Sequence, residues 1–259
     1  SSAASVVYKR QDIYSFIEDL APYRLQEDYD NSGLNVGEMS AEVRSVLVAL
    51  DCTAEVAREA CQRDFDLVLT HHPVIFRGLK TLVPNDPAVI LASGGKNALS
   101  MHTNFDSAEG GMNDVLCKML GLSPNGALHE EHGVGCGYVC DCGDMNVREL
   151  AQRAKDVLGC RVVRFSGGER EIRRVGVCSG SGGSFLADAA GKGCQALLTG
   201  DVKHDVFIDG ENMGVSVIDA GHFYTENIFC EFIANELKNK FSGLRVEIAV
   251  SNRDIVEVI

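Results

Sequence analysis

One strand-helix-strand pattern most constrains the fold of this chain. Residues 45–50 are mostly apolar and predict a buried strand, residues 53–63 predict a helix, and residues 66–70, with the apolar run Leu67-Val68-Leu69, predict a second strand. Such a unit predicts two parallel strands joined by a right-handed crossover. His71 and His72 follow the second strand directly, where open α/β sheets place their ligand sites. The sequence therefore predicts a functional site at these two histidines.

The geometry of the two histidines bears on how they would bind a metal. Pro73 pushes His72 towards extended geometry, and neighbouring side chains of an extended segment point to opposite sides. We therefore expect them to serve two ions, or one ion and a hydrogen bond, more readily than to chelate one ion. A pair of ordinary loop histidines is the alternative at this point.

Composition limits the class of protein. With 259 residues, 45% of them hydrophobic and 24% charged, the chain is typical of a soluble globular α/β protein. Its formal net charge of -13 argues against nucleic acid as a partner, although a local basic patch would be hidden in that sum. Small-molecule substrates and protein partners are favoured instead.

The N-terminal residues, the length of the apolar runs and the placement of the cysteines indicate the cellular compartment. Residues 1–5 have neither a basic segment nor an apolar core, and no apolar run reaches the roughly 18 residues of a membrane span. Several of the ten cysteines lie within apolar segments, as small hydrophobic residues do in a reducing compartment. We expect a cytoplasmic protein, with an organelle not excluded.

The remaining chain continues the alternation of helices and strands. Residues 121–132 are expected to be a connection, and a long helix is expected from 222 to about 237. Helices are also expected at 13–20, 87–92, 113–120 and 146–158, and strands at 98–101, 134–140, 161–165, 174–178, 215–218, 244–250 and 255–258. The predicted fold class is α/β, with mixed and largely parallel sheets and a metal site in the cleft at the strand C-terminal ends.

Two stretches of the chain are similar to each other. Residues 46–72 align without a gap to residues 175–201, and both end alike, as Leu69-Thr70-His71-His72 and Leu198-Thr199-Gly200-Asp201. Either an internal duplication or the general likeness of βαβ units explains this similarity. A duplication would give two related halves whose strand ends converge on one cleft.

Imidazoles and carboxylates follow three predicted strands. His102 and Asp106 come after one strand, and His222 and Glu226, also four residues apart, come after another. Neutral imidazoles and carboxylates suit two divalent ions about 3.5 to 4 Å apart, with Zn, Mn and Fe as candidates. We assign the metal ligands as His71, His72, Asp106, His222 and Glu226. His102 could be a further ligand, but we favour a residue that moves protons or that supports a ligand.

Five motifs together resemble the Nif-three-like family, whose members are often called GTP cyclohydrolase type 2 homologs. They are Asp30-Asn31-Ser32-Gly33-Leu34, Thr70-His71-His72-Pro73, His102-Thr103-Asn104-Phe105-Asp106, Thr199-Gly200-Asp201, and Asp219-Ala220-Gly221-His222 with Glu226. The resemblance implies a dinuclear metal centre at the five assigned ligands and a ring-shaped homohexamer. It also implies two α/β halves, 1–125 and 126–259, forming one compact unit without the inserted domain of longer members.

This chain departs from the family pattern at two places. Asp201 stands where the family commonly has Glu, so its carboxylate acts from a shorter side chain. The glycine-rich segment 133–140 lacks the basic residue that the family usually carries near Cys136, which argues against anion binding there.

A structural zinc site is a competing interpretation of one region. His129, His132, Cys136, Cys140 and Cys142 include a C-x3-C-x-C pattern. Cys136, Cys140 and Cys142 would share one face of an extended segment, however, as small residues do when they pack inward. We favour packing over zinc.

Two classes of function fit these residues. The first is a metal-dependent hydrolase in which His102 and Asp201 are the candidate catalytic residues that move protons. GTP is its substrate by family resemblance only. The second is a non-enzymatic role, as a ring-shaped interaction protein with transcription-related partners or as a metal-handling protein.

Overall fold

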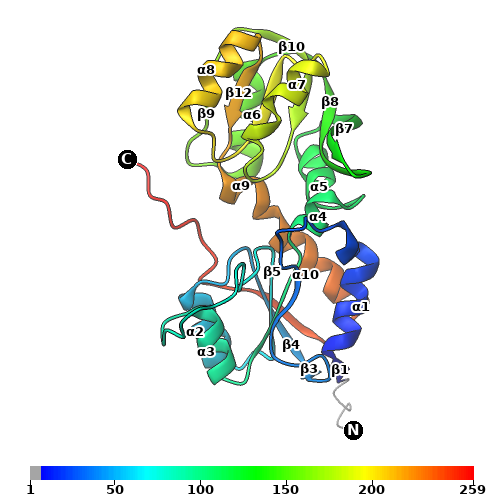
Figure 1. Ribbon diagram of the computed structural model, residues 1–259, viewed down its shortest axis with the longest axis vertical. Coiled ribbons are helices and arrows are strands. Elements are labelled where there is room, and N and C mark those ends of the chain that lie inside the picture. The colour runs from blue at the N-terminus through cyan, green and yellow to red at the C-terminus, as the bar shows by residue number, and fades with distance from the viewer. Residues whose placement is uncertain (1–6) are drawn as a thin grey trace. The chain divides into compact units, whose positions relative to one another are not determined.

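The computed structural model describes residues 7–259 and forms two compact units, each built on a mixed sheet (Figure 1). The first unit takes in the chain through Ala108 together with Phe229–Ile255. The second takes in Glu109–Ile228 together with Val256–Ile259. The N-terminal stretch 1–5, in which we expected no secretion signal, lies outside the described residues.

Parallel strands form the centre of the first unit's five-stranded sheet. The order is β13 (Arg245–Ile248), β4 (Ser45–Ala49), β5 (Leu67–Thr70), β6 (Asn97–Ser100) and β2 (Gly33–Val36). All neighbours are parallel except β2, which runs antiparallel to β6. A short antiparallel ribbon joins β1 (Tyr8–Lys9) to β3 (Glu42–Val43). The predicted parallel strand-helix-strand unit is therefore confirmed at β4 and β5.

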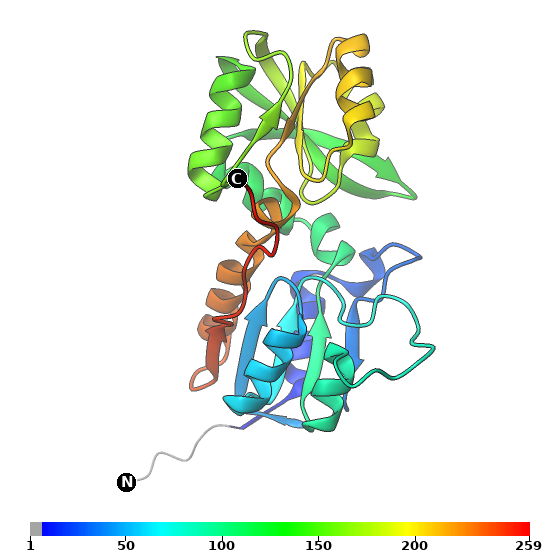
Figure 2. The same ribbon diagram turned by 90° about the vertical axis from the view of Figure 1, so that its left-hand side faces the viewer.

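Helices cover both faces of this sheet (Figures 1 and 2). On one side lie α2 (Ala54–Gln62) and α3 (Pro87–Ser93), and on the other lie α1 (Arg10–Leu20) and α10 (Ile228–Lys240). Every residue of β4 and β5 is buried, because a strand covered on two faces has no side for solvent. The short elements 3-10 helix Tyr23–Leu25 and α4 (Thr103–Ser107) complete the unit.

The second unit has a six-stranded sheet that is parallel in the middle and antiparallel at both edges. Its order is β7 (Ser123–Glu131), β8 (Val134–Asn146), β10 (Glu171–Val177), β11 (Ala196–Thr199), β12 (Ser216–Asp219) and β9 (Arg164–Phe165). Only β10, β11 and β12 are parallel to one another. The predicted α/β fold class with mixed sheets is thus confirmed, and where we expected largely parallel sheets the sheets are partly parallel.

Separate hydrophobic clusters pack on the two faces of this second sheet. The helix α6 (Val147–Leu158) packs on one face, and α7 (Leu186–Gly191) and α8 (His204–Met213) pack on the other. The remaining helices are α5 (Met112–Met119), α9 (His222–Glu226) and the 3-10 turn Gly183–Phe185. Asn146 caps α6, since its side chain accepts from the Glu149 amide at 2.9 Å and the Glu149 carboxylate accepts from the Asn146 amide at 2.9 Å.

The two similar stretches of sequence have the same strand register. Val46 pairs with Leu67 between β4 and β5, and Val175 pairs with Ala196 between β10 and β11. In the ungapped alignment of 46–72 with 175–201, Val46 corresponds to Val175 and Leu67 corresponds to Ala196. The two stretches therefore share their strand pairing as well as their sequence pattern.

Three elements differ from their predictions. The expected connection 121–132 contains the edge strand β7, which pairs with the long β8. The expected helix from 222 to about 237 is two helices, α9 and α10, with Asn227 between them. No secondary structure is found at 255–258, where a strand was expected.

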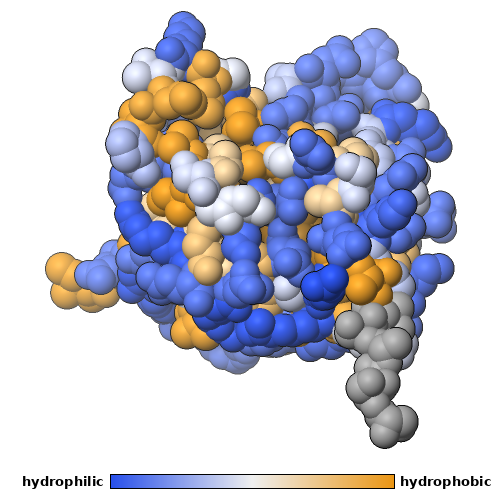
Figure 3. All heavy atoms as spheres, turned by 90° about the horizontal axis from the view of Figure 1, so that it is seen from below, coloured by the Kyte–Doolittle hydropathy of each residue, from blue (hydrophilic) through white to orange (hydrophobic). Residues whose placement is uncertain are grey.

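The surface is mainly polar on the face shown in Figure 3, where hydrophobic side chains lie in separate groups among hydrophilic ones. This agrees with the net charge of -13. Within residues 7–259, no helix combines the length and the apolar character that crossing a membrane requires.

Candidate metal centre

The first unit brings polar side chains to one edge of its sheet. Thr70, the last residue of β5, pairs with Ala49 of β4 and with Ser100 of β6, so the three parallel strands end side by side. Asp51 follows β4, His71 and His72 follow β5, and His102 follows β6. The register of the sheet therefore gathers these residues.

Three histidines form one compact group at this edge. The ring centroids of His71 and His72 are 4.9 Å apart, and those of His102 lie 5.2 Å and 5.3 Å from them. One ligand atom from each of the three residues lies within 4.8 Å of the other two. His71 is fully buried, and the other two are partly buried. The predicted histidines of the first unit are thus brought together.

The expectation that His71 and His72 point to opposite sides is wrong. Their rings are tilted by 50° and belong to the same group. The chain leaves extended geometry after β5, where the Thr70 hydroxyl donates to the His72 carbonyl at 2.7 Å. The His72 amide also donates to the Leu50 carbonyl at 3.1 Å. These bonds bend the segment so that neighbouring imidazoles meet.

Each of the three rings is oriented through its Nδ1 atom. That of His71 is 2.6 Å from the Met101 carbonyl oxygen, that of His72 is 2.7 Å from Asp51 Oδ1, and that of His102 is 2.7 Å from Asp30 Oδ1. Because carbonyl and carboxylate oxygens only accept, the proton of each neutral ring lies on Nδ1. Nε2 is then the nitrogen without a proton, which is the form of a ring nitrogen that binds a metal.

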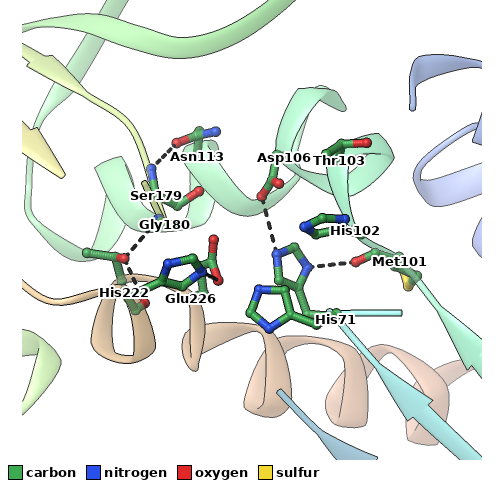
Figure 4. A network of polar contacts seen from close by, with 12 residues as sticks. His71, Met101, His102, Thr103, Asp106, Asn113, Ser179, Gly180, His222 and Glu226 are labelled. Carbon is green, nitrogen blue, oxygen red and sulfur yellow. Dashed lines mark hydrogen bonds and ion pairs between the residues drawn. The ribbon is translucent and has the colours of Figure 1, made fainter. Parts of the chain in front are cut away.

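Asp106 adds a carboxylate to this group. It lies on α4, which begins directly after His102, and its Oδ1 is 3.6 Å from His71 Nε2 (Figure 4). The ring of His71 packs against Phe229 at a centroid distance of 5.5 Å. A buried imidazole thus has an apolar neighbour on one side and a carboxylate on another.

Asp30 holds His102 and the start of α4 together. Its carboxylate accepts from the Ser32 hydroxyl at 2.8 Å and from the Thr103 hydroxyl and amide at 2.5 Å and 3.1 Å. Burial alone would raise the pKa of Asp30, but hydrogen bonds from His102, Thr103 and Ser32 outweigh it and lower that pKa below its ordinary value. Asp30 is therefore a carboxylate at neutral pH.

The second unit has its own pair of candidate ligands. His222 and Glu226 occupy the first and last positions of α9, and His222 Nε2 is 2.8 Å from Glu226 Oε2 (Figure 4). Nδ1 of His222 lies 2.8 Å from Asp201 Oδ2. The structure therefore brings together all three residues predicted in this part of the chain. Despite its shorter side chain, Asp201 reaches the ring.

A glycine makes room for the Glu226 carboxylate. Gly180 has a φ of +62°, and a Cβ built on it would lie 2.1 Å from Glu226 Oε1. Its amide is held by the Thr225 hydroxyl at 3.0 Å, and the neighbouring Ser179 amide donates to Asn113 at 2.9 Å. The loop after β10 is therefore fixed close to α9, and only glycine fits there.

These donor sets fit divalent metals. Two ligand atoms on one tetrahedral zinc ion lie roughly 3.4 Å apart, because each is about 2.1 Å from the metal. The 2.8 Å pair of His222 and Glu226 and the 3.6 Å pair of His71 and Asp106 are near that separation. Both units thus contain imidazole and carboxylate donors that could hold Zn, Mn or Fe.

Sequence reasoning gave no role to two carboxylates of this region. Asp30 was recognised only as part of a family motif, and Asp51 was not recognised at all. Asp51 had a usable signal, because it directly follows the predicted strand 45–50, as His71 follows the predicted strand 66–70. The role of Asp30 depends on a contact 72 positions along the chain, which no local pattern reveals.

The cysteine-rich region is a packing feature. Gly137, with a φ of +68°, breaks the alternation of β8, so that Cys136 packs on one face while Cys140 and Cys142 pack on the other. The expectation that all three share a face is wrong for this reason. A hydrogen bond with Cys117 and burial raise the pKa of the Cys140 thiol, which disfavours a metal-binding thiolate. The candidate ligand groups found within residues 7–259 contain no cysteine.

The fold and these residues define an α/β protein with histidine and carboxylate groups, candidate metal ligands, at the ends of its sheet strands. The model of the Duf34/NIF3 (NGG1p interacting factor 3) family matches residues 8–255. The chain belongs to this family.

Known proteins of the family are similar over nearly the whole chain. A "GTP cyclohydrolase 1 type 2 homolog" of Clostridium perfringens is 36% identical and covers 84% of this chain and 87% of its own. A "GTP cyclohydrolase 1 type 2" of Helicobacter pylori is 33% identical, covering 90% of this chain and 93% of its own. A crystal structure of a hypothetical protein from Staphylococcus aureus superposes with a TM-score of 0.87 at 26% identity, covering 97% of this chain and 99% of that one.

Proposed function

We propose that this protein is a metal-dependent hydrolase that acts on a small molecule and uses two divalent ions per chain. The observation that carries the proposal is the group of three histidines whose Nδ1 atoms are each held by an oxygen acceptor, so that in each neutral ring Nε2 is the nitrogen without a proton. The proposed ligands are His71, His72 and Asp106 in the first unit and His222 and Glu226 in the second. Divalent ions, when bound, supply Lewis acidity and lower the pKa of water.

The chain's other residues have separate parts in this proposal. Asp51 and Asp201 fix the orientation of His72 and His222 through hydrogen bonds to Nδ1. His102, fixed in the same way by Asp30, either adds a ligand or accepts a proton at Nε2 from water or substrate. Asp201, 63% exposed, can also exchange protons with solvent. His102 and Asp201 are therefore the proposed proton-moving residues.

The proposed substrate class is a nucleotide or a related small molecule. Its support is the name of the Helicobacter pylori relative, "GTP cyclohydrolase 1 type 2". Hydrolysis of a phosphoester or an amide fits the same donor chemistry. We further propose a homohexamer, from the family resemblance described above, and a cytoplasmic location, from the cysteines that lie within apolar segments of the sequence.

Elemental analysis combined with an activity screen tests the proposal. Purified wild type, His72→Ala and Glu226→Ala are analysed for bound metal and assayed with GTP and generic phosphoesters. His204→Ala is the matched control, since His204 is an exposed histidine at the start of α8. We expect about two ions in the wild type and the control, and loss of metal and hydrolysis together in the two ligand variants.

Two outcomes would contradict the proposal. Full turnover by a correctly folded His72→Ala or Glu226→Ala variant would show that these residues do not hold a catalytic metal. Tightly bound metal without turnover of any tested compound would favour a non-enzymatic interaction protein or a metal-handling protein. Exchange of the metal with an acceptor protein would then separate those two roles.

A further inference from the structure

Two exposed aromatic side chains lie next to the histidine group of the first unit. Tyr29 is 66% exposed and Phe76 is 40% exposed, and their ring centroids are 6.3 Å apart with an interplanar angle of 60°. We call these two residues the aromatic pair. The Phe76 ring is also 5.9 Å from the ring of His102, in an edge-to-face arrangement. The aromatic pair therefore adjoins a residue of the proposed site.

The backbone near both rings is fixed by hydrogen bonds. The Asn31 side chain donates to the Ile75 carbonyl at 2.6 Å, and the Val74 amide donates to the Asn35 side chain at 3.0 Å. The first of these bonds ties the residue before Phe76 to the segment that follows Tyr29. Because Asp30, between Tyr29 and Asn31, also binds His102, the aromatic pair and His102 are positioned by one network.

The chemistry of this arrangement points to one kind of ligand. Large aromatic side chains exposed to water beside a polar site carry a hydration cost that a bound apolar or aromatic group removes. Two tilted rings at this separation offer both a face and an edge, which are the contacts that a third planar ring prefers. An aliphatic ligand would gain burial but not this geometry.

We propose that the aromatic pair binds the planar aromatic ring of the substrate and so positions the substrate beside His102. The inference rests on the proposed function, because it assigns the substrate class of the same site. It makes Tyr29 and Phe76 specificity-determining residues. A substrate without an aromatic ring would lose this contact and bind more weakly.

Binding of matched compounds tests this inference without requiring turnover. Guanosine 5′-monophosphate is compared with ribose 5-phosphate, and phenyl phosphate with methyl phosphate, by calorimetric titration of the metal-loaded protein. The variants are Phe76→Leu, Tyr29→Leu and the double variant, which keep apolar bulk but remove the rings. Leu82→Ala is the control, since Leu82 is a 74% exposed apolar residue of the segment that follows Phe76.

We expect the aromatic member of at least one pair to bind the wild type about 10-fold more tightly than its non-aromatic counterpart. The double variant should lose this preference while its affinity for the non-aromatic member stays within about twofold. Leu82→Ala should keep the preference. The metal content of each variant, measured on the same samples, reports whether the His102 region is intact.

Several results would overturn the inference. One is that the wild type binds both members of each pair equally well. Another is that the double variant still prefers the aromatic member. A change in oligomeric state in the double variant, with no aromatic preference in the wild type, would assign the aromatic pair to contact with a second copy of the chain. A preference for aromatic compounds in a protein without hydrolytic activity would overturn the proposed function alone.

Discussion

Asp51 Oδ1 lies 2.7 Å from Nδ1 of His72, and the same relationship joins Asp30 to His102 and Asp201 to His222. In each pair the aspartate and the histidine come from different segments of the same unit. The aspartate contacts Nδ1, so that Nε2 is the nitrogen that would bind a metal. Carboxylates in this position fix the tautomer and raise the basicity of the ligating nitrogen. The repeated arrangement is a stronger indication of metal binding than any one histidine.

Asp51→Asn should weaken metal binding in the first unit about 10- to 100-fold. The side chain of Asp51 is 51% exposed, so the folded protein should tolerate the change. Competition with a chromophoric chelator measures the affinity. Glu55→Gln is the control, because Glu55 is an exposed carboxylate of the same unit that pairs with Arg253. Equal affinities in Asp51→Asn and wild type would show that this carboxylate does not support a ligand.

Asp30→Asn should reduce stability as well as metal binding. The Asp30 side chain is fully buried and accepts from three neighbouring residues besides His102, so an amide group would face donors that it cannot satisfy. We expect a loss of about 2 to 4 kcal/mol in the free energy of unfolding. Urea denaturation of Asp30→Asn and of Asp51→Asn measures the contrast. Equal stability of the two variants would contradict the structural role of Asp30.

Glu59 should give the segment after β13 a stability that depends on pH. Burial alone would raise the pKa of Glu59, but hydrogen bonds from Ser251, Val250 and Arg63 outweigh it and lower this pKa from 4.5 to about 2. Because the folded pKa is lowered, the stabilisation is complete above about pH 4.5 and is lost as the pH falls from there to about 2.

The measurement for Glu59 is amide hydrogen exchange at Val250 and Ser251. Compared with wild type at pH 7, Glu59→Gln should lower the opening free energy of these amides by about 1 to 2 kcal/mol. The difference between the two proteins should shrink towards zero near pH 2, where wild-type Glu59 also becomes protonated. A difference that stays constant over this range would mean that the Glu59 charge has no part in holding the segment.

Gly180→Ala should displace the carboxylate of Glu226. The new methyl group would lie 2.1 Å from Glu226 Oε1, at a backbone φ of +62° that is strained for alanine. We expect reduced metal content with retained secondary structure, measured by elemental analysis and circular dichroism. Gly191→Ala is the control, because a Cβ there has no neighbour within 4 Å. Normal metal content in Gly180→Ala would argue against Glu226 as a ligand.

Periodicity and strand ends were enough to predict the central parallel strands and the histidines that follow them. Features that depend on pairing between distant segments of the chain were not predicted. The strand β7 contains Pro124 and Gly126 and has few buried residues, so only its pairing with β8 defines it. The left-handed Gly137 inverts the pattern of β8, which local alternation cannot reveal. The contact of Asp30 with His102 likewise depends on the folded sheet.

The order of segments along the chain has a consequence for how the protein folds as it is made. Nearly all of the second unit is one continuous stretch, Glu109–Ile228, whereas the first unit needs β13 to pair with β4, about 200 positions earlier. A ribosome therefore completes the second unit's sheet while the first still lacks an edge strand and α10. Until then, β4 exposes an unpaired edge and apolar surface, the features that recruit chaperones or promote aggregation.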